Sequence, residues 1–202
     1  MDYGTGKSKR FVPAHEIADS LGSIKSAGLL MFHALTGCDT TSSFCGIGKK
    51  TAWSTWNNFP EVTHTFRALS EKDFEVTPDI INCLQKFVVL LYNKHLEVET
   101  VNEARRILFS QGTRTLENIP PTYGALLQHI HRAAYQAGFV WRQALNPLPT
   151  LPSPSLYGWK EVDGDWLINW TDLSEASDTC RELIKCRCKK NVVETASAKR
   201  MI

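Results

Sequence analysis

The residues whose types and spacing could do chemistry lie in one glycine-rich turn, with a carboxylate ahead of it and two lysines behind it. Asp39 is followed by six residues and then by Gly46-x-Gly48-Lys49-Lys50. Glycine lets a backbone turn tightly and approach a ligand closely. A helix beginning at the lysines would aim its free N–H groups and the positive end of its dipole at the same place. The stretch therefore predicts a clamp for a phosphodiester backbone, indifferent to base sequence because nothing in it reads bases.

Two predicted helices position this turn. Apolar residues recur through Ile24–Leu35 in a helical, largely buried pattern, and Gly37 is suited to the C-terminal cap of that helix. A second helix is expected from Lys49 to about Asn57. Residues 24–57 are therefore expected to form two helices with the glycine turn between them.

The rest of the pattern is mainly helical as far as residue 145. A short helix is expected at Ala14–Leu21, ended by Gly22. Further helices are predicted at Glu61–Leu69, Pro78–Tyr92, Val101–Phe109 and Tyr123–Leu145. Residues 146–155 contain four prolines, which predicts a stiff extended linker and the best domain boundary in the chain.

A different kind of structure is expected in residues 156–190. Tyr157–Val162 and Trp166–Trp170, joined by Asp163-Gly164-Asp165, predict a β-hairpin. Ser174 is suited to cap a last helix that runs to about Lys185, and residues 191–202 are expected to form a disordered tail. The hairpin tryptophans fit either an aromatic binding face or the hairpin's own core.

The segment resembles the helix-hairpin-helix-type part of flap endonucleases and their PIN-like relatives. Those proteins have Gly-small-Asp, six residues, and then Gly-Ile/Val-Gly-x-Lys-x-Ala, which is the spacing of Gly37–Ala52 here. The resemblance implies a mainly α chain, the C-terminal helical part of an α/β domain. It implies that Asp39 matches the last metal-binding carboxylate of the nuclease site. It also implies that Gly46, Gly48, Lys49 and Lys50 grip duplex backbone, often with a bound K⁺.

The acidic residues limit what the resemblance implies about catalysis. Only Asp2, Glu16 and Asp19 precede Asp39, whereas a two-metal phosphodiesterase needs several carboxylates. The chain is expected to be the C-terminal part of a longer protein or a truncated copy, inactive alone. It would be a Mg²⁺-dependent endonuclease if the complete protein supplies the missing carboxylates. Lys49, where the family often has proline, is a milder departure.

The whole chain is similar to a group of uncharacterised animal proteins associated with transposon-like gene families. The shared stretches are His33–Phe44, Pro120–Trp141, a tryptophan-rich segment and an ending that opens a cysteine cluster. Cys180, Cys186 and Cys188 could begin a zinc module, but zinc takes four ligands and this cluster offers three. Free thiols are the other interpretation.

Composition narrows the setting without naming a function. The net charge is only +2, so a nucleic-acid-binding surface must be local, and Arg105, Arg106 and Arg114 fit either its extension or a solvated helix face. No apolar run is long enough to span a membrane and no leader is recognised, so we expect an intracellular protein, nuclear or cytoplasmic and not secreted.

Three hypotheses of different classes follow. The first is sequence-nonspecific binding of duplex or branched DNA by a nuclease-like fragment, with protein partners left open. The second is a domesticated, transposon-derived scaffold for protein–protein interaction that has lost nucleic-acid activity. The third is a fragmentary gene product without a stable function.

Overall fold

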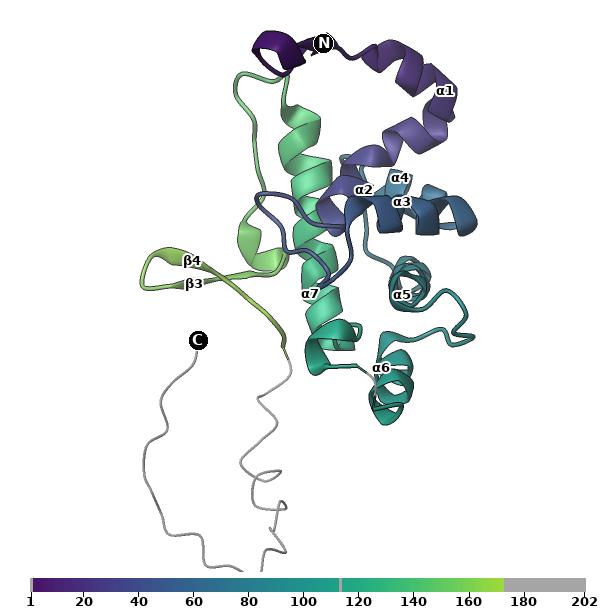
Figure 1. Ribbon diagram of the computed structural model, residues 1–202. Helices are drawn as coiled ribbons and strands as arrows, with labels where there is room; N and C mark the ends of the chain where they lie inside the picture. Colours follow the sequence, from purple (N-terminus) through teal and green to yellow (C-terminus); the bar gives the residue numbers. More distant parts are fainter. Residues whose placement is uncertain (1, 113, 173–202) are drawn as a thin grey trace, which may run out of the picture. The chain divides into compact units, whose positions relative to one another are not determined.

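Helices make up most of the computed structural model, which describes residues 2–112 and 114–172 (Figure 1). In chain order they are α1 (Ala14–Ala27), α2 (Leu29–Leu35), α3 (Lys49–Asn58), α4 (Val62–Leu69), α5 (Pro78–Tyr92), α6 (Val101–Ser110) and α7 (Tyr123–Ala134). Single 3₁₀ turns lie at Gly6–Ser8, Leu116–Asn118, Trp141–Gln143 and Pro154–Leu156. The prediction of a mainly helical fold is confirmed, and its relation to a flap-endonuclease-like domain stays a prediction.

Two antiparallel ribbons occur among the described residues. β1 (Asp2–Tyr3) pairs with β2 (Arg10–Phe11), and β3 (Trp159–Val162) pairs with β4 (Asp165–Ile168). Asp163 and Gly164 join β3 to β4 with φ values of 54° and 86°. Positive φ at both central residues is what a two-residue hairpin turn requires, and Asp-Gly supplies it at low steric cost. The predicted hairpin is confirmed.

Threonine caps explain where three of the helices begin. The hydroxyls of Thr77, Thr100 and Thr122 accept hydrogen bonds from backbone N–H groups in the first turns of α5, α6 and α7. Each such cap satisfies one N–H that has no partner within its helix and typically stabilises a helix by about 1 kcal/mol. Pro78 follows Thr77 at the first helical position, where its missing N–H costs nothing.

The helix predicted over Ile24–Leu35 is in fact two helices. α1 is interrupted by a kink at Gly22, where the backbone leaves helical geometry with φ 74°, as the predicted helix end at that glycine requires, and α2 starts after Gly28. A Cβ on Gly28 would lie 3.1 Å from Cβ of Phe66, so the break lies where α4 approaches the backbone closely. Ser70 at the end of α4 accepts from the Met31 N–H, satisfying a donor in the first turn of α2. Contact with α4 therefore decides where α2 begins.

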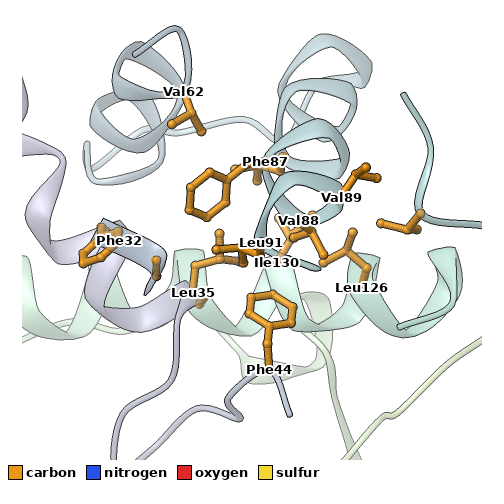
Figure 2. Packing of buried hydrophobic residues seen from close by; sticks show 14 of the residues in the cluster. Phe32, Leu35, Phe44, Val62, Phe87, Val88, Val89, Leu91, Leu126 and Ile130 are labelled. Atoms are coloured by element: carbon orange, nitrogen blue, oxygen red, sulfur yellow. The ribbon is translucent and has the colours of Figure 1, made fainter. Parts of the chain in front are cut away.

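The core lies where α2, α4, α5 and α7 meet (Figure 2). Leu35, Phe87, Val88, Leu126 and Ile130 are completely buried there. Burying a side chain of this kind contributes roughly 1.5–3 kcal/mol. Aromatic rings extend the same core to α3, since Trp56 lies with its centroid 4.8 Å from Phe32 and 5.0 Å from Phe66. α3 is thereby fixed to the rest of the molecule.

The helix predicted over Tyr123–Leu145 changes type part-way. Regular α-helix ends at Ala134, a π-helical stretch covers Tyr135–Val140, and a 3₁₀ turn follows. A Cβ on Gly138 would lie 2.8 Å from the ring of Phe74, so this stretch packs directly beneath an aromatic residue from another part of the chain. The change of helix type accompanies that tertiary packing, which a local sequence pattern does not contain.

The proline-rich segment 146–155 and the hairpin pack back onto α7 and its extension. Gln143 exchanges hydrogen bonds with the backbone of Thr150, and the Tyr135 hydroxyl donates to the Pro152 carbonyl. Arg132 Nη1 donates to the Gly158 carbonyl at 3.0 Å and to the Asn169 carbonyl at 2.6 Å. The helices and the hairpin therefore belong to one compact unit that extends to Asp172.

Several predicted features lie outside the described residues. These are the helix predicted after Ser174, the cysteines Cys180, Cys186 and Cys188, and the tail 191–202. Within residues 2–112 and 114–172, no helix has the length and apolar character that crossing a membrane demands.

Candidate nucleic-acid interface

Residues 36–48, the loop between α2 and α3, carry the predicted clamp, and close contacts hold its first half. Thr41 Oγ1 donates to the Ala34 carbonyl at 2.6 Å. Gly37 has a φ of 98°, and a Cβ on it would lie 2.5 Å from Cβ of Ser43. Both the left-handed backbone and the close crossing of the chain therefore require glycine at this position.

Phe44 anchors the second half of the loop to the core. Its side chain is buried and makes edge contacts with Tyr92 of α5 and His129 of α7, at centroid distances of 6.5 and 5.3 Å. Figure 2 shows the Phe44 ring pointing from the loop into the cluster that holds Leu35 and Ile130. The exposed turn that follows is consequently held in place by a buried ring.

The turn at Gly46–Gly48 leads directly into α3. The Ile47 N–H donates to the Phe44 carbonyl at 3.0 Å, and Gly46 has a φ of 73°. Gly48 occupies the N-cap position in extended geometry, with no side-chain cap, and nothing lies within 4 Å of where its Cβ would be. No side chain of the described residues caps the first N–H groups of α3, and the space beside Gly48 is open, which is an arrangement that favours an anion.

The two lysines at the start of α3 have different roles in the structure. Lys49 Nζ turns inward, donating to the His33 carbonyl at 2.7 Å and to Thr36 Oγ1 at 2.6 Å. It thus caps the C-terminal end of α2, where a cation interacts favourably with the helix dipole. Burial lowers the pKa of Lys49, and nearby Cys38 opposes that effect. Lys50 is exposed and forms no hydrogen bond or ion pair with any described residue.

Asp39 lies in the exposed turn after Cys38, away from any set of acidic groups. Among residues 2–112 and 114–172, no three His, Cys, Asp or Glu side chains form a group that could hold a metal ion. The described residues around Asp39 therefore do not fit the Mg²⁺ centre that the resemblance implies, and no catalytic step follows from them. K⁺ at the Gly46 turn stays a prediction.

His33 is the titratable neighbour of both Asp39 and Lys49. Burial lowers the pKa of His33, the positive charge of Lys49 lowers it further, and the Asp39 carboxylate opposes both. The imidazole stacks on Trp141, with ring centroids 5.4 Å apart. His33 therefore joins the end of α2 to the 3₁₀ turn that follows the π-helical stretch and is not arranged as a metal ligand in the described structure.

The cysteines beside the loop are free thiols in the described part of the chain. Burial would raise the pKa of Cys38, but hydrogen bonds with Thr40 and Thr41 outweigh burial and leave the pKa lower than usual. Cys38 Sγ lies 3.0 Å from Thr41 Oγ1, so this thiol helps to fix the loop. Cys45 is exposed beside Gly46 and is not paired with Cys38.

The structure also brings polar groups to the turn, including one of the three arginines that the sequence analysis gave as a possible extension of the basic surface. Arg114 lines a cleft together with Gly46 and Ile47, whereas Arg105 donates to the Pro120 carbonyl. Thr51, Ser54 and Asn58 lie along one face of α3. Their spacing of three and seven residues predicts that they share one helix face. The neighbouring sequence does not indicate which other segment that face borders.

The arrangement is thus an anchored turn, an uncapped helix N-terminus and a lysine without a partner in the part of the chain that the structure describes, all at one exposed place. No protein-family model, no curated protein and no solved structure matched this chain in comparisons with known proteins.

Proposed function

We propose that this protein binds the sugar–phosphate backbone of duplex or branched DNA without sequence preference. The contact is formed by the Gly46–Gly48 turn, the first turn of α3 and the ammonium group of Lys50. One observation carries the proposal: uncapped helix N–H groups, two glycines and a lysine that has no partner among the described residues coincide at one exposed point. Anions are stabilised at such a point, and phosphates are the anions that a nucleic acid presents at regular intervals.

Lys49 and Lys50 make different contacts, and this difference assigns each of them a role in the proposal. Lys49 donates two hydrogen bonds from its ammonium group to atoms of the protein and thereby holds α2 and α3 together. Lys50 donates no hydrogen bond to any described residue, so all three of its ammonium protons are available to a ligand there. We therefore assign the direct phosphate contact to Lys50 and a positioning role to Lys49.

Catalysis is not part of what this chain is proposed to do alone. Asp39 would become a metal ligand only in a complete protein that supplies further carboxylates, as a Mg²⁺-dependent phosphodiesterase. DNA as the partner favours a nuclear location.

The proposal is tested by charge reversal with a matched control. Lys50→Glu should weaken binding to a short labelled duplex roughly tenfold and reduce the salt slope of the affinity by about 1. Lys72→Glu makes the same charge change at an exposed site between α4 and α5 and should leave the affinity nearly unchanged. Fluorescence anisotropy over about 50–200 mM salt measures both quantities.

Two outcomes would overturn the proposal. One is that the unmodified protein fails to bind duplex at low salt. The other is that the two variants lose affinity equally, because the loss would then come from the lower net charge of the protein and not from the position of Lys50. Circular dichroism melts of both variants separate loss of binding from loss of folding.

The second candidate function is a protein–protein scaffold, favoured by aromatic residues exposed on and beside the C-terminal hairpin. Trp166 is 43% exposed and Trp170 is 61% exposed. Exposed tryptophans are typical of interface anchors. Absence of DNA binding at low salt would favour this candidate.

A further inference from the structure

Two clefts lie beside the proposed clamp, one lined by residues of the Gly46 turn and the other by residues of α3. The first, of about 310 Å³, is lined by Gly46, Ile47, Arg114, Thr115 and Asn118, and we name it the Arg114 cleft. The second, of about 430 Å³, is lined by Thr51, Ser54, Thr55, Asn58, Lys94 and His95, and we name it the Lys94 cleft. Tyr92 lines both clefts, so they are neighbours on the surface.

The Arg114 cleft presents a guanidinium group beside the glycine turn. Arg114 is half-buried, and Nη1 donates one long hydrogen bond of 3.3 Å to the Asn118 carbonyl. No ion pair with a carboxylate occupies Arg114 among the described residues. Gly46 also lines this cleft, and among the described residues the atom nearest to where its Cβ would be is Asn118 Oδ1, at 3.4 Å. A phosphate oxygen could approach both the guanidinium and the turn.

α3 contributes small polar side chains to the Lys94 cleft, which Leu90, Leu91, Tyr92 and Asn93 at the end of α5 also line. Thr51, Ser54, Thr55 and Asn58 recur at the spacing that places residues on a single helix face. Lys94 and His95 follow α5 on the facing loop and are exposed. Hydroxyl, amide and ammonium groups are the side chains that most often contact phosphate and sugar in protein–DNA complexes.

The charge of both clefts has one sign. Among the described residues, no Asp or Glu lines either of them, whereas Arg114 and Lys94 are positively charged. Along the chain, Lys50 comes after the loop residues that line the Arg114 cleft and directly before Thr51, which lines the Lys94 cleft. Glu97 and Glu117 lie close to the two clefts in sequence but line neither.

We infer that the two clefts and the clamp form one continuous track for a single nucleic-acid strand. The backbone would run from the Arg114 cleft across the first turn of α3 into the Lys94 cleft, with phosphates held on both sides of the one at Lys50. The inference rests on the proposed function and deepens it. It makes the ligand a strand with several consecutive phosphates and distinguishes it from an isolated phosphate or a small anion.

The track is tested by reversing charge at its two ends. Arg114→Glu and Lys94→Glu should each weaken duplex binding about fivefold to tenfold and each reduce the salt slope by about 1. The double variant should lose the product of the two factors, and inorganic phosphate should compete poorly with the duplex. Lys72→Glu is the charge-matched control, and Arg114→Lys, which keeps the charge, should retain most of the affinity.

The outcomes separate the track from the clamp. If Lys50→Glu weakens binding while both end variants behave like Lys72→Glu, the track is wrong and the clamp stands. If no variant differs from Lys72→Glu, or the unmodified protein does not bind, both proposals fail. Thermal melts of Arg114→Glu and Lys94→Glu should match the unmodified protein, because neither side chain is fully buried or ion-paired in the described structure.

Discussion

The protein contains two glycine-dependent turns that expose opposite kinds of chemistry. The Gly46–Gly48 turn is anchored by the buried ring of Phe44 and presents backbone N–H groups and a cation. The Asp163–Gly164 turn ends a hairpin that is tied to α7 by Arg132 and presents tryptophan and aliphatic side chains. The first suits a polyanion and the second an apolar partner. The two leading hypotheses for the protein therefore belong to different surfaces and can be tested separately.

The glycines of the two regions provide the sharpest contrast in stability. Gly37→Ala should destabilise the protein by about 4 kcal/mol, because a left-handed residue and a steric collision with Ser43 both count against it. Gly164→Ala shares the positive φ but has open space around it, so its cost should be about 1 kcal/mol. Urea unfolding followed by tryptophan fluorescence measures both. Equal costs would show that the loop before α3 is not the tightly packed region described here.

The second prediction concerns pH and the support of the same loop. His129 packs against Phe44, and its Nε2 lies 2.8 Å from the Leu35 carbonyl, so that nitrogen donates. Burial lowers the pKa of His129 to about 4, with nearby Arg132 contributing. The unfolded chain takes up a proton near pH 6.5 while the folded chain does not, so stability is complete above that pH and falls toward pH 4.

The size of this loss follows from the interval between the two pKa values. A tenfold change in proton affinity corresponds to about 1.4 kcal/mol, so the loss should approach about 3 kcal/mol. His33 and His131, whose pKa values burial also lowers, should act in the same direction. His129→Gln should therefore flatten the pH dependence of unfolding without removing it. An unchanged profile in that variant would mean that His129 is not the main acid-sensitive group.

Local signals in the sequence were enough for much of the fold. The Thr-Pro start of α5 and the Asp-Gly turn of the hairpin each specify their structure within a few residues. The break at Gly28 was missed because its cause is the close approach of Phe66, far along the chain. The Arg114 cleft was missed for the same reason, since Arg114 and Gly46 meet only through the tertiary fold. The inward turn of Lys49 likewise depends on where α2 ends, so two adjacent lysines looked equivalent.

The smallest predicted effect tests that inequality of the lysines. Lys49→Met should destabilise the protein by about 1 kcal/mol, because the His33 carbonyl and the Thr36 hydroxyl lose a charged donor at a partly exposed site. Lys50→Met removes no contact seen in the described structure and should stay within about 0.5 kcal/mol of the unmodified protein. In DNA binding the order should reverse, with Lys50→Met losing more affinity at a temperature where both variants are folded. Equal melting temperatures together with equal affinities would show that the lysines share one role, and the distinction between a positioning and a contacting lysine would be wrong.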